Sequence, residues 1–167
     1  MRVISNSGPL LSFARAGRLS LLRDAIGEIV IPEAVYEDIV VRGQGKPGSD
    51  AIREASWIIR QRVEDRSLVD QLPAKLHGGE REAIALAREL GVALLVDEQE
   101  ARKEAQRLGI AYFGSLRVLK EAKEKGIGNP VKPILDELVA SGRYLRPTLY
   151  REFLREMGEE QGTRPAS

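Results

Sequence analysis

Short apolar runs alternate along the chain with longer stretches in which apolar residues recur every three or four positions. The short runs predict strands. They are 2–5, 28–31, 57–60, 92–96 and 110–113. The periodic stretches predict amphipathic helices. They are 10–15, 19–25, 32–41, 51–55, 80–90, 98–108, 115–125, 131–140 and 148–157. Strands separated by helices favour right-handed crossovers, so we expect a three-layer α/β/α sandwich with a central, mainly parallel sheet.

The length indicates a single folded unit. A chain of 167 residues is large enough to bury its own core, and neither repeats nor a linker divide it. We expect one domain over residues 1–157 and a disordered tail over 158–167, which is rich in glycine and polar residues.

Composition excludes several classes of protein. With no cysteine and one histidine, the chain has no disulfide framework and no His- or Cys-rich zinc site, so a cytoplasmic location is the default expectation. The apolar runs are far shorter than the roughly 20 residues of a membrane span, so we expect no membrane contact. The formal net charge is only +1, so nucleic-acid binding would need a local basic patch or a metal ion.

Four oxygen-bearing side chains are candidates for a functional site. Asn6 and Asp97 directly follow predicted strands, and ligands of parallel sheets bind at the carboxyl ends of strands. On helical wheels, Asp38 and Glu80 lie at the edges of apolar stripes, whereas Glu82 falls on the far side. Carboxylates without His or Cys suit the hard cations Mg²⁺ and Mn²⁺, and such sites commonly hydrolyse phosphodiesters.

Purely structural roles are open for the same residues. Asp97 with Glu100 matches a capping box at the start of a helix, and Glu80 is a first-turn acid that the helix dipole favours. Asp38 fits an ordinary helix-edge residue, and Asn6 fits a turn or cap.

Two other features do not predict chemistry. The glycines from Gly43 to Gly48 match a dinucleotide fingerprint, but they follow a helix and include Pro47, so we expect no nucleotide cofactor. His77 has no second histidine or cysteine partner and is interpreted as a loop residue.

Four segments together resemble the PIN-domain family, and within it the VapC-like toxins of toxin–antitoxin pairs. They are Val3–Leu10, Ile31–Ile39, Gly79–Ala87 and Leu94–Glu98, and the later pairs Ala101-Arg102 and Gly114-Ser115 extend the likeness. The resemblance covers roughly residues 1–145 and implies an α/β/α sandwich with metal-dependent ribonuclease activity.

The resemblance also assigns roles to individual residues. It implies that Asp38, Glu80 and Asp97 bind Mg²⁺ or Mn²⁺ and that Asn6 supplies a neutral oxygen. Arg102 and Ser115 are then expected to contact the RNA substrate. An antitoxin protein and a second copy of the chain are the further partners that it implies.

Asn6 departs from the family pattern, which has an aspartate at this position. An amide keeps an oxygen but removes a charge, and this weakens a Mg²⁺ site. Asp38 in place of the usual glutamate shortens the reach by one methylene. The alternative hypothesis is therefore a PIN-like module that binds nucleic acid or protein with little or no catalysis.

Overall fold

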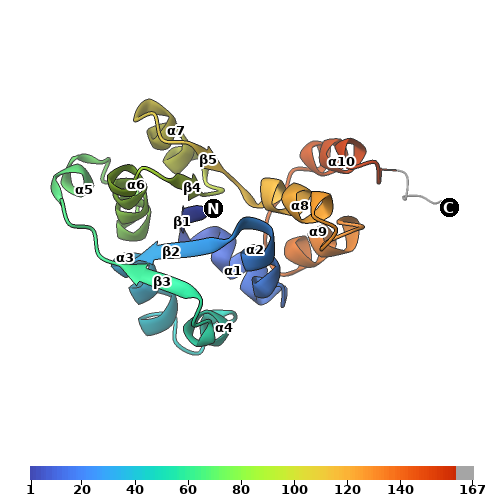
Figure 1. Ribbon diagram of the computed structural model, residues 1–167, viewed down its shortest axis with the longest axis horizontal. Coiled ribbons are helices and arrows are strands. Elements are labelled where there is room, and N and C mark those ends of the chain that lie inside the picture. The colour runs from blue at the N-terminus through green and yellow to red at the C-terminus, as the bar shows by residue number, and fades with distance from the viewer. Residues whose placement is uncertain (161–167) are drawn as a thin grey trace.

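A five-stranded parallel sheet forms the centre of the protein, as a computed structural model of residues 1–160 shows (Figure 1). The order across the sheet is β3-β2-β1-β4-β5, and each neighbouring pair is parallel. The strands are β1 (Arg2–Ser5), β2 (Glu28–Pro32), β3 (Ile58–Gln61), β4 (Ala93–Leu95) and β5 (Tyr112–Phe113). All five strands match the predicted runs, which confirms the expected fold class.

Ten α-helices and one π-helical turn surround the sheet within residues 1–160. In chain order they are α1 (Ser7–Arg15), α2 (Leu19–Ile26), α3 (Glu33–Tyr36), the π-helical turn η1 (Glu37–Val41), α4 (Ser49–Glu54), α5 (Ser67–Gln71), α6 (Gly78–Leu90), α7 (Gln99–Arg107), α8 (Ser115–Glu124), α9 (Lys132–Ala140) and α10 (Pro147–Glu156). The short helix α5 was not predicted. No helix within residues 1–160 combines the length and apolar character that crossing a membrane requires.

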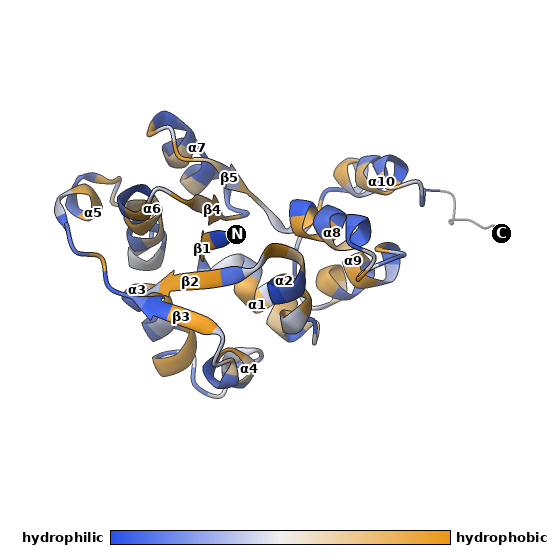
Figure 2. Cartoon of the chain, viewed as in Figure 1, coloured by the Kyte–Doolittle hydropathy of each residue, from blue (hydrophilic) through white to orange (hydrophobic). Residues whose placement is uncertain are grey.

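The core has two halves, one on each face of the sheet. Val3 and Leu95 point to one face, where α1, α2, α8 and α9 cover them. Their neighbours Ile4 and Leu94 point to the other face and pack with α5, α6 and α7. Figure 2 shows mainly hydrophobic colour on β2 and β4, as expected for strands buried on both faces.

The order of the strands creates a crevice at the carboxyl edge of the sheet. The chain runs outward from β1 through β2 to β3, and then returns to the other side of β1 with β4. The connections after β1 and β4 therefore leave in opposite directions, and such a switch point is where ligands bind in open α/β sheets. The residues that follow β1 and β4 are Asn6 and Asp97 with its neighbours.

The π-helical turn differs from the single regular helix predicted for 32–41. Its backbone closes a wider ring, in which the N–H of Arg42 donates to the carbonyl of Glu37 at 2.8 Å. A helical wheel assumes 3.6 residues per turn, so it misplaces side chains at such a bulge. The wheel position of Asp38, which lies in this turn, is affected in the same way.

Glu159, near the end of the described residues, is held by contacts with α8 and α9. The Glu159 carboxylate is largely buried and accepts the backbone N–H groups of Val131 and Lys132, at 2.9 and 2.8 Å. It also receives Lys123 from α8. Glu159 therefore caps the start of α9 from within the segment 158–167 that we expected to be a tail. Residues 161–167 of that predicted tail lie outside the described residues.

We expect Glu159→Gln to lower the free energy of unfolding by about 2 kcal/mol at neutral pH, the scale of lost hydrogen bonds to a charged group. Burial raises the pKa of Glu159, but hydrogen bonds from Lys123 and the two backbone N–H groups outweigh it and leave that pKa below its ordinary value. A lowered folded-state pKa stabilises the fold above the unfolded pKa of about 4.3, and this contribution is lost as pH falls through the folded value.

Urea unfolding of wild type and Glu159→Gln between pH 7 and pH 3 measures the effect, and the gap between the two proteins should close toward pH 3. Glu156→Gln is the matched control, since Glu156, the last residue of α10, pairs with Lys120 at the exposed surface, where ion pairs contribute little. A Glu159→Gln variant as stable as Glu156→Gln at pH 7 would contradict the capping role.

Candidate active site

The pairing of β1 with β4 places Asn6 next to the segment that leads into Asp97. Ser5 lies opposite Leu95 in the register, and the Asn6 N–H donates to the Leu95 carbonyl at 3.1 Å. Asn6 is only 3% exposed and is the N-cap residue of α1, without a side-chain hydrogen bond to the helix. Its side chain is therefore buried at the switch point without performing the capping that the alternative interpretation gave it.

Asp97 is the most strongly compensated acid of the site. Its side chain is 8% exposed, and its two carboxylate oxygens accept the Ser115 N–H at 2.8 Å and the Ser115 hydroxyl at 2.6 Å. Arg143 lies 3.3 Å and Arg102 4.0 Å from Oδ1, and Arg102 is itself fixed by donating to the Val96 carbonyl. A buried carboxylate needs such partners.

The capping-box interpretation of Asp97 is wrong. Glu98 occupies the N-cap position of α7, and Asp97 turns away toward Ser115 at the start of α8. Glu100 points to the surface instead, where it pairs with Lys75 at 2.8 Å and with Lys103 at 3.7 Å.

Glu80 and Glu98 form a pair of carboxyl groups near Asp97. Glu80 is 6% exposed and accepts the backbone N–H of His77 at 2.9 Å, so it also performs the first-turn role that the helix dipole favours. Partial desolvation raises the pKa of Glu98, and hydrogen bonding to Glu80 and the charges of Glu80 and Asp97 raise it further. Sequence reasoning missed Glu98, although it directly follows Asp97.

Asp38 lies beside the same helix start but faces outward. A Cβ atom on Gly79 would sit 3.0 Å from Asp38 Oδ2, so the carboxylate is close to the first turn of α6. Its other oxygen receives Arg42, and the side chain is about one third exposed. Asp38 is therefore next to Glu80 in space, but its charge is already paired.

The wheel placement of Glu82 is wrong. Glu82 is buried, accepts the Ala34 N–H at 3.0 Å, and binds Arg66 at 2.7 Å. It ties the first turn of α3 to α6 and contacts none of the pocket acids in these hydrogen bonds. The wheel failed because α3 and Arg66 bury a flank of α6 that the apolar stripe does not mark.

The donor chemistry fits a hard divalent cation, although the predicted ligands do not form one cluster. Within residues 1–160, no three carboxylate or imidazole groups gather closely enough to hold a metal ion, so Asp38, Glu80 and Asp97 are not assembled together. Mg²⁺, however, commonly binds through one or two carboxylates and keeps water and substrate phosphate as its other ligands. The Glu80–Glu98 pair, whose mutual repulsion a cation relieves, meets that requirement.

A basic cleft opens directly beside Asp97. It has a volume of about 690 Å³ and lies between the β5–α8 connection and the loop that joins α9 to α10. Its charged lining consists of one acid and four arginines. These are Asp97, Arg102, Arg117, Arg143 and Arg146. Asp97 therefore lies at the basic cleft and also near the Glu80–Glu98 pair.

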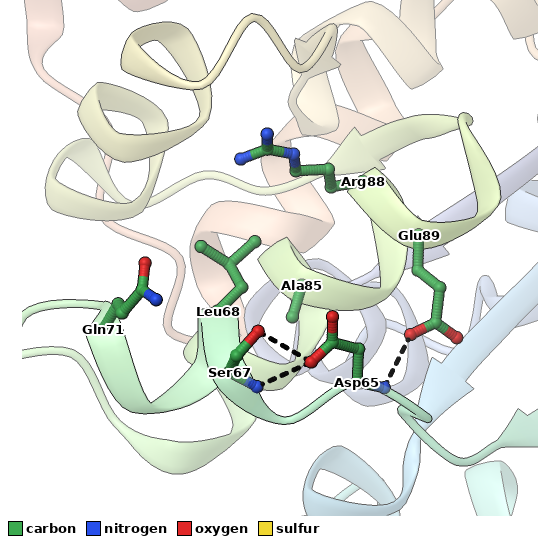
Figure 3. A pocket seen from close by; sticks show the side chains of 7 residues that line it. All are labelled: Asp65, Ser67, Leu68, Gln71, Ala85, Arg88 and Glu89. Atoms are coloured by element: carbon green, nitrogen blue, oxygen red, sulfur yellow. Dashed lines mark hydrogen bonds between the residues drawn. The ribbon is translucent and has the colours of Figure 1, made fainter.

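A separate hollow of about 410 Å³ lies between α5 and α6 (Figure 3). Its polar groups are engaged in fixing the loop before α5, because Asp65 accepts the Ser67 N–H and hydroxyl and Glu89 accepts the Asp65 N–H. It adjoins the end of α6 opposite Glu80, so it is no part of the candidate site.

The comparisons with known proteins agree with this fold. A family model described as a PIN domain matches residues 2–159. A PilT N-terminus domain protein from the hyperthermophilic archaeon Sulfolobus solfataricus P2 has a similar structure, with a TM-score of 0.51 and 14% identity. That similarity covers 87% of this chain and 98% of the archaeal chain. A search of curated proteins finds no significant match.

The fold and the acidic switch point define a PIN domain, and the chain belongs to this family. PIN domains are generally nucleases, so the site described above is where nuclease chemistry is to be sought. The structural neighbour supports the fold alone.

We expect Gly114→Ala to lower the free energy of unfolding by about 1–3 kcal/mol, as overpacking does. A Cβ at this position would lie 2.1 Å from Arg102 Nη2 and 2.5 Å from Asp97 Oδ1, so the ion pair must move. Urea unfolding measures the change. Gly78→Ala is the control, since a Cβ there meets no atom within 4 Å. Equal stability of the two variants would show that the Asp97 arrangement is not tightly packed.

Proposed function

We propose that the protein is a metal-dependent ribonuclease whose active site is the pocket of Glu80, Glu98 and Asp97. One observation carries the proposal: a close pair of carboxyl groups lies beside a buried, arginine-compensated aspartate at the switch point of a PIN fold. The carboxylate pair suits a cation and the arginines suit a phosphate, and phosphodiester hydrolysis needs both.

Each residue of the pocket then has a definite task. Glu80 and Glu98 would hold Mg²⁺ or Mn²⁺, which supplies a more acidic bound water and neutralises charge on the phosphate. Ser115 orients Asp97 with two hydrogen bonds, and Asp97 in turn holds Arg102 and Arg143 at the mouth of the basic cleft. The arginines then face an incoming phosphate in fixed positions.

Several roles implied by the family resemblance stay predictions. Direct metal binding by Asp38 and Asp97 and a neutral oxygen ligand from Asn6 belong to this group. Substrate contact by Ser115 also stays a prediction, although its burial and its bonds to Asp97 favour positioning. Arg102, half-buried and 5.4 Å from the Tyr112 ring centre, is the better placed of the two for a phosphate.

The biological setting is part of the same proposal. The likeness to VapC-like toxins supports a toxin that acts on RNA in the cytoplasm and is blocked by an antitoxin protein. A homodimer is the assembly that this likeness favours. Co-expression with the product of a neighbouring gene, followed by growth and size-exclusion measurements, tests these partners.

We expect purified protein to cleave a labelled structured RNA in Mn²⁺ or Mg²⁺ and to lose this activity in chelator. Glu80→Gln and Glu98→Gln each remove one charge from the carboxyl pair, so cleavage should fall roughly 100-fold or more, beyond the loss typical of residues that only support a metal ligand. Asp97→Asn should also abolish cleavage, because it releases both arginines. Gel analysis of cleavage rates gives the comparison.

Glu100→Gln is the matched control, since Glu100 lies in the first turn of α7, two residues after Glu98, but pairs with lysines at the surface. It should cleave at the wild-type rate. Folded wild type that leaves RNA intact, or pocket variants that cleave as fast as Glu100→Gln, would refute the nuclease proposal for this pocket.

A second candidate function is a nucleic-acid-binding module with weak or absent catalysis. Asn6 favours it, because this buried position lies beside the segment that leads into Asp97 and carries no charge. Protein binding by the same module is a variant of this hypothesis.

Asn6→Asp distinguishes the two functions. If Asn6 limits metal binding, the variant should bind Mn²⁺ at least about tenfold more tightly and should unfold at a higher temperature when Mn²⁺ is present. Isothermal titration and thermal unfolding measure both effects. Gln99→Glu adds the same charge at the edge of the cleft and serves as the control. Cleavage that appears only in Asn6→Asp would favour the binding module for the natural chain.

A further inference from the structure

Glu82 is a buried acid whose two carboxylate oxygens are both engaged inside the fold. It lies on α6, two residues after Glu80. Its Oε1 accepts the backbone N–H of Ala34 at 3.0 Å, and its Oε2 accepts Arg66 at 2.7 Å. A buried ion pair contributes little net stability compared with apolar residues of similar size. The role of Glu82 is therefore to be sought in what it holds in place.

The segment that Glu82 holds is the one that carries Asp38. Helix α3 continues directly into η1, and Asp38 follows Ala34 by four residues, about one helical turn. A second contact fixes the far end of this turn, because a Cβ atom on Gly79 would lie 3.3 Å from Val35 Cγ2 and 3.0 Å from Asp38 Oδ2. Glu82 and Gly79 therefore hold both ends of the segment against the first turns of α6.

These contacts place Asp38 beside Glu80. Gly79 and Glu80 are consecutive residues in the first turn of α6, and the Asp38 carboxylate lies against that turn. The partner of Asp38 is Arg42, whose side chain is 69% exposed. Ion pairs at such exposed positions contribute little, so a divalent cation can take the place of Arg42. Asp38 can then add a carboxylate oxygen to the cation site that the proposed function assigns to Glu80 and Glu98.

We propose that Glu82 is a positioning residue of the metal site, which holds the start of α3 and thereby keeps Asp38 next to Glu80, where both carboxylates bind one Mg²⁺ or Mn²⁺ ion. The inference rests on the proposed ribonuclease function and adds a residue that touches neither metal nor substrate. Without the hydrogen bond to Ala34, α3 is less firmly held on α6. Because a cation such as Mg²⁺ accepts ligands only within narrow limits of distance, a small shift of Asp38 lowers the affinity of the site.

Calorimetric titration of the full chain with Mn²⁺, in the absence of RNA, tests the proposal with two opposite substitutions. Glu82→Asp keeps the charge but shortens the reach toward the Ala34 N–H, so it should weaken Mn²⁺ binding at least about threefold, as expected for coupling within one hydrogen-bond network. Glu82→Gln removes the charge but keeps an oxygen for that N–H, so it should retain most of the wild-type affinity. Circular dichroism verifies that each variant is folded at the temperature of the titration.

Glu89→Asp is the matched control. Glu89 also lies on α6 and accepts backbone N–H groups, from Glu64 at 3.1 Å and from Asp65 at 3.2 Å. It does so at the end of the helix away from Glu80, so Glu89→Asp should bind Mn²⁺ with the wild-type affinity.

A double-mutant cycle tests whether the effect of Glu82 passes through Asp38. In an Asp38→Asn background the site has already lost the carboxylate that Glu82 positions, so Glu82→Asp should change the Mn²⁺ affinity by less than about twofold. A general weakening of the fold would instead lower the affinity by the same factor in both backgrounds.

The outcomes separate this inference from the ribonuclease proposal. The positioning role is overturned, even if the protein cleaves RNA, when Glu82→Asp binds Mn²⁺ as tightly as wild type or when Glu82→Gln loses as much affinity as Glu82→Asp. Equal losses for Glu82→Asp in the two backgrounds also overturn it. A loss that is confined to Glu82→Asp and disappears in the Asp38→Asn background supports the role even if no RNA is cleaved. Wild type that binds no Mn²⁺ overturns both proposals.

Discussion

The need to neutralise one buried carboxylate organises the functional end of this protein. Asp97 lies two residues after β4, the neighbour of the central strand β1, and its side chain is largely shielded from solvent, so its charge must be met by the protein itself. Ser115 supplies two hydrogen bonds from the start of α8, and Arg102 and Arg143 approach from α7 and from the loop after α9. One side chain thereby ties the start of α8 and the loop after α9 to the segment that joins β4 and α7. The close approach at Gly114 shows how little room this arrangement leaves.

The same neutralisation divides the site into two electrostatic regions. On the side of α6, partial desolvation and hydrogen bonding to Glu80 raise the pKa of Glu98. A close pair of carboxyl groups suits a cation. On the side of α8 and α10, arginines dominate and suit an anion. A phosphodiester bond and its metal ion need these two regions in contact. Asp97 forms the boundary between them, which is why it matters for both.

Much of the fold followed from local patterns. The apolar runs were found as strands because the inner strands β1, β2 and β4 are covered on both faces and bury most of their side chains. Glu80 was placed correctly by its wheel because α6 is a regular helix with one continuous apolar stripe. Glu82 was misplaced because its partners, the start of α3 and Arg66, come from other parts of the chain. The position of Asp38 on the helical wheel was inaccurate, because Asp38 lies in a π-helical turn and a wheel assumes a regular α-helix.

The sequence by itself determined the strand–helix alternation, the acidic residues at strand and helix ends, and the departure at Asn6, since these depend on residue type and short-range periodicity. Tertiary structure decided which charges meet. Glu98 interacts with Glu80, and Asp97 accepts hydrogen bonds from Ser115 instead of capping α7. The arginines of the α9–α10 loop lie at the site only because that loop folds back across β5 and α8. Long-range electrostatic partners are selected by packing of distant segments, and local patterns carry no record of that packing.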